Sequence, residues 1–451
     1  MADTATEKIL FVSLGCDKNL VDSEEMLGLL TAAGYGITDC EEEADIIVIN
    51  TCCFIHDAKE ESVNTILEMA EWKKEGRCKI LAVTGCLAQR YQKEIVEEIP
   101  EVDLVLGTAS TDEILKGLNQ VKKSGPCLDF KELTYLPRFS TERLLTEGGH
   151  HAHLKIAEGC NKHCTYCIIP KIRGPYRSVP MDDLVRQAEY LASQGVRELI
   201  LVAQETTIYG VDLYGEKKLH ELLERLCRIP GFVWIRVLYC YPEEIYDDLI
   251  QVMKREKKIC HYLDMPIQHA SDRILKRMGR RTSRQELENI VEHLRQEIPD
   301  IVLRTTLITG FPGETEEDHE ELMQFVNDME FDRLGVFTYS PEEDTPAYAM
   351  PDQIDEEVKL DRRDALMELQ QEISLENGEK RIGQKLLVMI EGKVADENAY
   401  VGRTYGDAPK IDGYIFINTE RELMSGDFAW VRVTGALEYD LMGELMDEYT
   451  E

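Results

Sequence analysis

The sequence predicts an α/β protein in three parts: a doubly wound parallel-sheet domain over residues 1–125, a partial (β/α)6 barrel over residues 146–378, and a small antiparallel β-barrel over residues 379–451. Three observations support this division. Apolar runs of strand length alternate with helical patterns through most of the chain, as is typical of parallel sheets. A glycine-containing connector at residues 121–150 interrupts the alternation. After residue 379, short β-rich runs are separated by glycine turns.

A cysteine follows each of the first three strands expected in the first domain. The strands are expected at residues 8–14, 45–49, 79–83 and 102–106, with helices at 20–33, 57–72 and 87–98. Parallel strands end at the same edge of a sheet, where open α/β folds bind ligands. We therefore expect Cys16, Cys52 and Cys86 to share one metal cluster, with Cys53 able to replace its neighbour. The alternative is that they are small buried thiols.

Six strands are expected in the second domain, at residues 154–157, 198–202, 234–238, 262–265, 302–308 and 334–339. The loop after the first of them carries Cys160, Cys164 and Cys167 at C-x3-C-x2-C spacing, and Gly159 permits a tight turn. A closed zinc site and a cuboidal iron–sulfur cluster each normally take four ligands, whereas this loop supplies three. The spacing favours a four-iron cluster with one open iron. A zinc loop with a distant fourth ligand and unrelated buried thiols are the alternatives.

This loop resembles the signature of the radical S-adenosylmethionine (SAM) enzymes, in which an aromatic residue, here Tyr166, precedes the third cysteine. The resemblance implies that Cys160, Cys164 and Cys167 hold a 4Fe-4S cluster whose open iron chelates the amino and carboxylate groups of SAM. Tyr166 is then expected at the cofactor. The resemblance also implies reductive cleavage of SAM to a 5′-deoxyadenosyl radical, which removes hydrogen from an unactivated carbon.

Further loops on the same face of the expected barrel carry groups suited to binding SAM. Glu205 follows the second strand, and its carboxylate could receive the ammonium group of SAM. His269 follows the fourth strand and fits a structural role as well as a catalytic one. Gly310 and Glu314 follow the fifth strand, where backbone freedom and an acidic group could bind ribose hydroxyls. Their common location is the reason to consider them together.

The composition narrows the class of partner. A net charge of −35 makes a large nucleic-acid footprint improbable, because such affinity depends on Lys and Arg neutralising phosphates. Little nucleic-acid binding is therefore expected, and basic proteins are more natural partners. Thirteen cysteines, without a secretion signal at residues 1–8, indicate a reducing cytoplasm and metal or thiolate chemistry. Cys40, Cys78 and Cys127 are expected to be structural. No stretch resembles a membrane span.

The last part of the chain is also acidic. A charged helix is expected at residues 355–375 as a linker, followed by strands at residues 386–390, 414–417 and 430–433. Residues 379–451 contain 15 acidic and 8 basic side chains, a net charge of −7. A small β-barrel often indicates nucleic-acid binding, but this sign of charge is wrong for it.

The whole pattern is similar to the radical SAM methylthiotransferases over essentially the full length, with the C-terminal barrel as their TRAM domain. One subfamily, of the MiaB type, modifies an adenosine of tRNA, and another modifies the β-carbon of an aspartate of small-subunit ribosomal protein twelve. The stretch Ser13–Glu24 resembles the second subfamily, since the tRNA enzymes have Gln and Met or Lys variants after Cys16. The resemblance implies that Cys52, and not Cys53, is the cluster ligand, since the subfamily commonly has glycine at the position of Cys53.

The resemblance implies a mechanism with two 4Fe-4S clusters. The cluster at Cys160, Cys164 and Cys167 cleaves SAM, and the radical removes a β-hydrogen from the aspartate. A second cluster at Cys16, Cys52 and Cys86 carries the sulfur, and a second SAM supplies the methyl group. An electron donor such as flavodoxin is implied. The alternatives are a tRNA methylthiotransferase and a non-catalytic iron–sulfur protein of the ribosome or RNA, although open coordination sites argue against a structural role.

Overall fold

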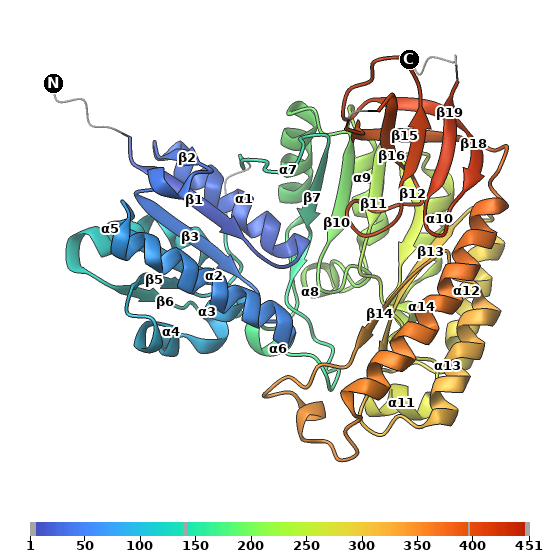
Figure 1. Ribbon diagram of the computed structural model, residues 1–451, viewed down its shortest axis with the longest axis horizontal. Helices are drawn as coiled ribbons and strands as arrows, with labels where there is room; N and C mark the ends of the chain where they lie inside the picture. The colour runs from blue at the N-terminus through green and yellow to red at the C-terminus, as the bar shows by residue number, and fades with distance from the viewer. Residues whose placement is uncertain (1–5, 139–141, 396, 447–451) are drawn as a thin grey trace.

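A computed structural model describes residues 6–138, 142–395 and 397–446 of the chain. The N-terminal domain lies beside an open parallel sheet, and the C-terminal barrel lies at one end of that sheet (Figure 1). None of the helices in these residues has the length and apolarity to cross a bilayer.

The N-terminal domain is the doubly wound parallel sheet that the sequence predicts, with strand order β2-β1-β3-β4-β5-β6. The strands are β1 (Lys8–Ser13), β2 (Gly36–Thr38), β3 (Ile46–Thr51), β4 (Ile80–Gly85), β5 (Val102–Leu106) and β6 (Cys127–Asp129). The helices are α1 (Asp17–Ala32), η1 (Glu41–Glu43), α2 (His56–Glu75), α3 (Cys86–Tyr91), α4 (Lys93–Glu98), η2 (Thr111–Glu113) and α5 (Ile114–Ser124). Strands β3 and β4 are buried throughout, which is why they are continuous apolar runs. Because β6 pairs with β5, the sheet continues past residue 125.

The central sheet contains all six expected strands, in the order β14-β13-β12-β11-β10-β7. They are β7 (His151–Lys155), β10 (Glu198–Val202), β11 (Trp234–Val237), β12 (Ile259–Asp264), β13 (Val302–Thr309) and β14 (Arg333–Thr338). A short antiparallel pair, β8 (Ala157–Glu158) and β9 (Arg177–Ser178), brackets the cysteine loop. The first strand expected at residues 154–157 is thus divided between β7 and β8.

Helices cover the outer face of this sheet (Figure 1). The helices of this domain are α6 (Ile169–Ile172), α7 (Met181–Ser193), α8 (Val211–Tyr214), α9 (Leu219–Cys227), η3 (Pro242–Glu244), α10 (Asp247–Arg255), α11 (Asp272–Arg277), α12 (Arg284–Glu297), α13 (Glu316–Met329), η4 (Pro346–Ala349) and α14 (Glu356–Glu379). Of these, α6 packs on α3 of the first domain instead. The linker role expected for residues 355–375 is wrong. Helix α14 packs on β14 and α13 and buries Leu366 and Ile373 in the main core, so it completes the barrel wall.

The C-terminal domain is a closed barrel of five strands in the order β15-β16-β17-β19-β18. They are β15 (Lys385–Lys393), β16 (Ala399–Thr404), β17 (Ile415–Asn418), β18 (Phe428–Ala436) and β19 (Leu441–Leu445). The barrel is antiparallel as expected except for β17 and β19, which pair in parallel. Residues 447–451 of the expected domain lie outside the described residues.

This small barrel closes the end of the central sheet at which the strands begin. Glu198, the first residue of β10, lies fully buried between Arg236 of β11 and Arg403 of β16, each with a donor nitrogen 2.7 Å from one of its oxygens. Met389 and Ala408 of the C-terminal domain pack against side chains from inside the sheet, including Trp234. We call this contact the barrel floor. It lies at the end of the strands opposite the cysteine loop.

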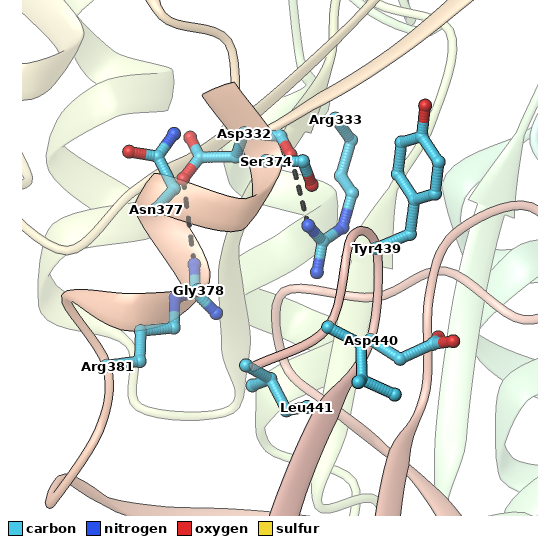
Figure 2. Close-up of a pocket in the computed structure, with 10 residues that line it drawn as sticks. Asp332, Arg333, Ser374, Asn377, Gly378, Arg381, Tyr439, Asp440 and Leu441 are labelled. Atoms are coloured by element: carbon cyan, nitrogen blue, oxygen red, sulfur yellow. Dashed lines mark hydrogen bonds and ion pairs between the residues drawn. The ribbon is translucent and has the colours of Figure 1, made fainter. Parts of the chain in front are cut away.

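A smaller contact joins the C-terminal domain to α14 and the start of β14. Figure 2 shows the recess there, with Asp332 paired to Arg381 at 3.6 Å. Its enclosed volume is about 10 Å³, room for about one water molecule. Gly378 of α14 has no side chain because a Cβ there would lie 2.9 Å from that of Ala436. The recess is a packing contact and is too small for a cofactor.

Candidate active site

The three strand-end cysteines of the first domain come together as expected. Cys16 precedes α1, Cys52 follows β3 and Cys86 begins α3, and β1, β3 and β4 are neighbours in the sheet. Burial raises the pKa of the Cys52 thiol, and the charges of Cys16 and Arg173 act on it as well. Burial also raises the pKa of Cys86, on which the other two cysteines act. We call these three residues the N-terminal triad.

Two glycines allow the loops of the N-terminal triad to approach one another. Gly15 has φ +90, and a Cβ there would lie 2.7 Å from the Cβ of Cys52. Gly85 has φ +91, and a Cβ there would lie 2.5 Å from the carbonyl oxygen of Thr51. Both conformations are ones that side chains other than glycine rarely adopt. The close approach of two strand ends therefore explains each glycine immediately before a cysteine.

Asn19 ties the loops together. Its side-chain nitrogen donates to the carbonyl oxygens of Leu14, at 2.9 Å, and Thr51, at 3.0 Å, so it joins the loops after β1 and β3. Asn19 is fully buried, and these bonds satisfy its amide group. The relative positions of Cys16 and Cys52 are thus fixed by a side chain three residues after the first of them.

Cys53 is fully buried in a core cluster of the first domain that also contains Cys86. Burial raises the pKa of its thiol to about 12, with Arg90 opposing the effect. Arg90 also pairs with Glu342 at 3.3 Å. This placement supports Cys52 as the ligand and Cys53 as a packed thiol.

The second set, Cys160, Cys164 and Cys167, lies on the loop between β8 and α6 and is called the barrel triad. Gly159 turns the chain with φ +78, and a Cβ there would lie 2.3 Å from the carbonyl oxygen of Pro175. Burial raises the pKa of Cys160 to about 11, and Cys164 acts on it as the nearest like group. The pKa of Cys167 is also raised, by burial and then by Cys164.

Both triads fit an iron–sulfur cluster better than a single zinc ion. Thiolates around one zinc ion lie about 3.8 Å apart, given Zn–S bonds of about 2.3 Å in a tetrahedron. Among the described residues, neither triad has all of its sulfurs within 4.8 Å of one another. Burial raises the pKa of two thiols in each triad, Cys52 and Cys86 in the first and Cys160 and Cys167 in the second, and coordination by a metal would deprotonate them. The donor set, its spacing and the missing fourth cysteine agree with a cluster that has one open iron.

Arg173 joins the N-terminal triad to the second domain. It follows α6, directly after the barrel triad, and its guanidinium group donates to the Cys86 sulfur at 3.4 Å. It is 2% exposed and pairs with Asp22 of α1 at 2.8 Å and with Glu158 at 3.2 Å. A buried cation that is fully paired in this way holds its partners in fixed positions. Arg173 therefore sets the position of the N-terminal triad relative to the barrel.

Glu205 lies at the barrel triad as the sequence predicts. It is fully buried, and one carboxylate oxygen accepts a hydrogen bond from the Thr207 backbone nitrogen at 3.0 Å. The other oxygen is buried without a hydrogen-bond partner. Burial raises the pKa of Glu205 to about 7, partly opposed by Lys162. A buried carboxylate with one unpaired oxygen beside Cys160 is suited to an ammonium group.

Glu205→Gln is expected to weaken SAM binding by about ten- to a hundredfold at pH 8, which corresponds to the loss of one charge-assisted hydrogen bond. In the unmodified protein the ammonium group would favour the carboxylate form, so binding below pH 7 must displace a proton. Affinity should therefore fall as pH decreases below 7, and this dependence should be absent from Glu205→Gln. Equilibrium dialysis with SAM across pH measures both, with the exposed Glu221→Gln as control. Equal affinities at pH 8 would remove Glu205 from the cofactor site.

The loop after β13 carries Glu314, whose carboxylate pairs with side chains of two other segments. Glu314 is buried, with one oxygen 2.9 Å from Arg362 of α14 and the other 3.6 Å from His269 and 3.2 Å from the Phe311 nitrogen. Although burial alone would raise its pKa, His269 and Arg362 hold it below its usual range. Both oxygens have partners, so Glu314 orients the loop, and its contact with ribose stays a prediction. His269 likewise serves the packing of this loop.

Gly310 and Tyr166 shape the same side of the site. Gly310 has φ +69, and a Cβ there would lie 2.2 Å from the side chain of Lys359, so it makes room for α14. The Tyr166 ring meets Phe311 edge to face at 6.5 Å. Tyr166 is therefore held against the loop that follows β13, and Gly310 allows that loop to pack.

The sequence did not predict three positively charged side chains that lie near the triads: Lys18, Arg173 and Arg280. Arg280 is buried over the Tyr241 ring at 4.2 Å, and the charges of Tyr166 and Cys164 act on its pKa. Lys18 lies 3.2 Å from the centre of the Tyr239 ring and is buried beside Cys16. Lys18 could have been predicted from its place in the sequence, because it lies two residues after Cys16 in the Ser13–Glu24 stretch.

Comparison with protein families agrees with this architecture. Residues 8–107 match the uncharacterized protein family UPF0004, residues 154–326 the radical SAM superfamily, and residues 382–446 the TRAM domain. Together with the barrel triad, these matches define a radical SAM enzyme with a TRAM domain.

Curated relatives identify the family more closely. A ribosomal protein uS12 methylthiotransferase RimO from Lachnoclostridium phytofermentans is 64% identical over 97% of this chain and 99% of its own length. The RimO proteins of Clostridioides difficile and Pelotomaculum thermopropionicum are 50% and 53% identical, over 98% and 97% of this chain and 99% of each relative. The chain belongs to the RimO family of radical SAM methylthiotransferases, enzymes that use SAM and 4Fe-4S clusters.

Solved structures share the fold at low identity. The radical SAM methyltransferase TsrM from Kitasatospora setae, with cobalamin and a 4Fe-4S cluster bound, has a TM-score of 0.56 at 13% identity, over 93% of this chain and 84% of TsrM. The cobalamin-dependent radical SAM enzyme OxsB has a TM-score of 0.52 at 13% identity, over 76% of this chain and 55% of OxsB. These likenesses concern the fold alone.

Proposed function

We propose that this chain attaches a methylthio group to the β-carbon of an aspartate of ribosomal protein uS12. The observation that carries the proposal is the pair of three-thiol sites in adjacent domains, joined by Arg173 through its 3.4 Å contact with Cys86. The relatives named as uS12 methylthiotransferases support the choice of substrate. A methylthio transfer needs both a radical source and a sulfur source, which two sites can provide.

We assign the residues as follows. The barrel triad, Cys160, Cys164 and Cys167, and the N-terminal triad, Cys16, Cys52 and Cys86, each hold one 4Fe-4S cluster. When bound, the first cluster supplies the electron that cleaves SAM, and the second supplies the sulfur. The protein's own part is positioning: Glu205 receives the ammonium group of SAM with its unpaired oxygen, and Arg280 offsets negative charge at Cys164. Tyr166 keeps the cofactor side of the loop packed against Phe311.

We assign recognition of the substrate carboxylate to Lys18. It is a buried cation beside Cys16, and it faces Tyr239 on the loop after β11. Burial alone would lower its pKa, but Tyr239, Cys16 and Asp17 together raise it, so Lys18 stays charged. Tyr239 has φ +61, a backbone conformation that is costly for a residue other than glycine. A cation held beside the N-terminal triad suits an aspartate and has no counterpart in the chemistry of adenine.

Lys18→Met should raise KM for uS12 by about ten- to a hundredfold, the effect of one lost hydrogen bond to a charged group. SAM cleavage to 5′-deoxyadenosine should continue, because Lys18 contacts none of the barrel triad's loop in the described contacts. Steady-state product formation and 5′-deoxyadenosine release, measured on the same samples, separate the two effects. Lys8→Met, at an exposed lysine on β1, is the control. An unchanged KM would show that Lys18 is only structural.

The function itself is tested by mass spectrometry of ribosomal protein uS12 and of tRNA from a strain that lacks the gene. We expect uS12 to lose the mass of one methylthio group and tRNA to be unchanged. Restoration of the mass by the unmodified chain, but not by a variant lacking the barrel triad, ties the change to this enzyme. A change confined to an adenosine of tRNA would put the tRNA enzyme in place of this proposal.

We also propose that the acidic C-terminal barrel steers the basic substrate and binds little nucleic acid. Glu420 and Glu422 are exposed on the loop after β17, at the end of the molecule away from the triads. Glu420→Gln with Glu422→Gln should lower the association rate with uS12 about threefold at low salt and leave kcat unchanged. The effect should vanish at high salt, since charges screen beyond about 8–10 Å. Stopped-flow binding measures this, and an unchanged rate at low salt would exclude steering by these two residues.

The electron that SAM cleavage requires has to come from outside the chain. We propose a small reducing protein such as flavodoxin as the donor. Product formation with reduced flavodoxin in place of a chemical reductant is the corresponding measurement.

A further inference from the structure

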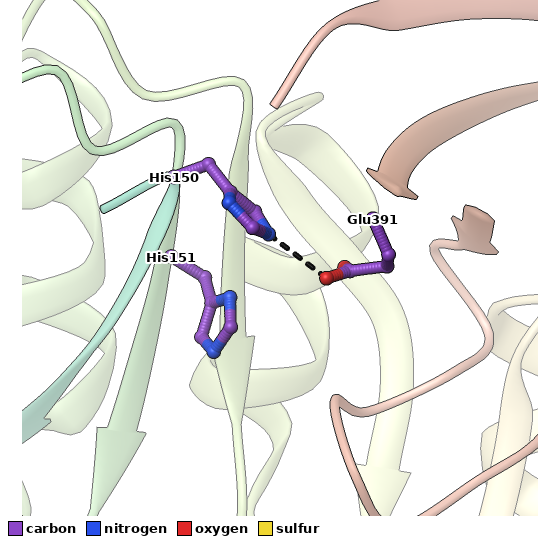
Figure 3. A group of neighbouring side chains, drawn as sticks. All are labelled: His150, His151 and Glu391. Carbon is purple, nitrogen blue, oxygen red and sulfur yellow. Dashed lines mark hydrogen bonds and ion pairs between the residues drawn. The ribbon is translucent and has the colours of Figure 1, made fainter. Parts of the chain in front are cut away.

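Two histidines and a glutamate meet at the barrel floor, at the end of the strands opposite the barrel triad. His150 and His151 are the last residue before β7 and its first residue, and Glu391 lies on β15 of the C-terminal barrel (Figure 3). One ligand atom from each lies within 4.8 Å of the other two. In the described parts of the chain, no other three histidine, cysteine or acidic residues bring their ligand atoms within 4.8 Å of one another.

The contacts around His150 and Glu391 orient them as metal ligands are usually oriented. Nδ1 of His150 lies 3.3 Å from the carbonyl oxygen of Gly148, and Nε2 lies 2.8 Å from one oxygen of Glu391. The other oxygen of Glu391 accepts from Arg403 at 2.6 Å. Metal-binding histidines commonly donate their second ring nitrogen to a carbonyl, and metal-binding carboxylates are held by a further hydrogen bond. Nε2 and the facing carboxylate oxygen contact each other, and an ion would take the place of the hydrogen between them.

His151 is the least satisfied member of the group. It is 5% exposed, and neither of its ring nitrogens has a hydrogen-bond partner. The nearest carboxylate oxygen, from Glu147, lies 3.5 Å from Nε2. A buried polar group without a partner costs free energy that a ligand could recover. A hydrogen-bonded pair of His150 and Glu391 would explain those two residues, but it leaves His151 with one ion-pair distance to Glu147 and no hydrogen bond at Nδ1.

The space around the group is shaped by two glycines. A Cβ on Gly148 would lie 2.7 Å from the His150 ring, and a Cβ on Gly426 would lie 2.7 Å from the His150 Cβ. Both have positive φ, +49 and +89. The turn at Gly148 lets consecutive side chains at positions 150 and 151 approach the same point, which a regular strand would send to opposite faces. The site is therefore built by both domains.

We infer that His150, His151 and Glu391, with a water molecule as the fourth ligand, bind one divalent transition-metal ion of the zinc type and that this ion clamps the C-terminal barrel to β7. Imidazole nitrogens with one carboxylate suit zinc and related ions and disfavour magnesium and calcium, which take oxygen ligands. Arg403 is not an obstacle to a cation, because its charge is already shared between Glu198 and Glu391. The ion has a structural role and no part in the methylthio transfer.

The test measures zinc in the cluster-loaded, full-length protein after anaerobic dialysis against Zn²⁺ and removal of the excess. We expect about one equivalent of zinc in the unmodified protein and in His293→Ala, a control at an exposed histidine of α12. We expect less than a tenth of that in His151→Ala and in Glu391→Gln. Iron measured on the same samples shows whether zinc has entered the cysteine sites instead.

Thermal unfolding gives a second readout. Chelation of zinc should lower the unfolding midpoint of the unmodified protein and leave those of His151→Ala and Glu391→Gln unchanged, since only the first can be stabilised by the ion. Glu391→Gln keeps the size of the side chain, so it tests the ligand role if His151→Ala disturbs folding. Equal zinc in the unmodified protein and in Glu391→Gln, or none in the unmodified protein, would show a hydrogen-bonded network without a metal.

Discussion

Replacement of Cys160, Cys164 and Cys167 by alanine is expected to reduce formation of 5′-deoxyadenosine by about a thousandfold or more. The three thiols on the loop between β8 and α6 act as a unit in SAM cleavage. Removing residues that act as a unit removes almost all of the activity that they provide together. The N-terminal triad should still assemble its cluster, because its loops are joined by Asn19 and not by the barrel triad. Chromatography of the nucleoside product and iron content per chain measure the two expectations.

A matched control is Cys227→Ala, at a half-buried cysteine of α9. It should keep both SAM cleavage and iron. Substantial 5′-deoxyadenosine from the triple variant would contradict the assignment of the barrel triad. Loss of all iron would instead show that the two sites cannot assemble separately.

Replacement of Cys16, Cys52 and Cys86 by alanine should leave SAM cleavage measurable and reduce methylthio product about a thousandfold or more. The reason is that the barrel triad, Glu205 and Arg280 are untouched, whereas the second three-thiol site is lost. Arg173 loses its contact with Cys86 but keeps Asp22 and Glu158, so its charge remains paired. The measurement is mass spectrometry of uS12 together with 5′-deoxyadenosine from the same reaction.

Cys53→Ala is the control for the N-terminal triad, because Cys53 adjoins Cys52 but faces the core and Arg90. It should retain full iron and product while lowering the free energy of unfolding by about 1 kcal/mol, the typical cost of a point substitution. Full product from the triple variant would remove the sulfur-carrier role. Loss of product in Cys53→Ala would show that Cys53, and not Cys52, is the cluster ligand.

Much of the fold follows from local pattern. Strands β3 and β4 are buried on both faces, so their apolar runs could be recognised without any knowledge of the partner strands. The neighbouring positions of Cys16, Cys52 and Cys86 follow from parallel strands ending at one edge. The barrel triad was readable because all three thiols lie on one loop.

Other features depend on contacts between distant segments, which no local pattern encodes. Helix α14 is rich in charge, yet Leu366 and Ile373 are enough to bury one side of it in the core. Glu314 was correctly placed near the barrel face but could not be seen to pair with Arg362, 48 residues away. The roles of Arg173 and Lys18 depend on how the first domain docks on the barrel.

The barrel floor has a consequence for how the chain can be divided. Because Met389 and Ala408 share a core with Trp234, and because Glu198 is neutralised from both domains, a cut before residue 379 would expose apolar surface and leave a buried charge partly unpaired. The TRAM domain is therefore not a removable module. It is the missing wall of an incomplete barrel, and the two should melt together in a single cooperative transition.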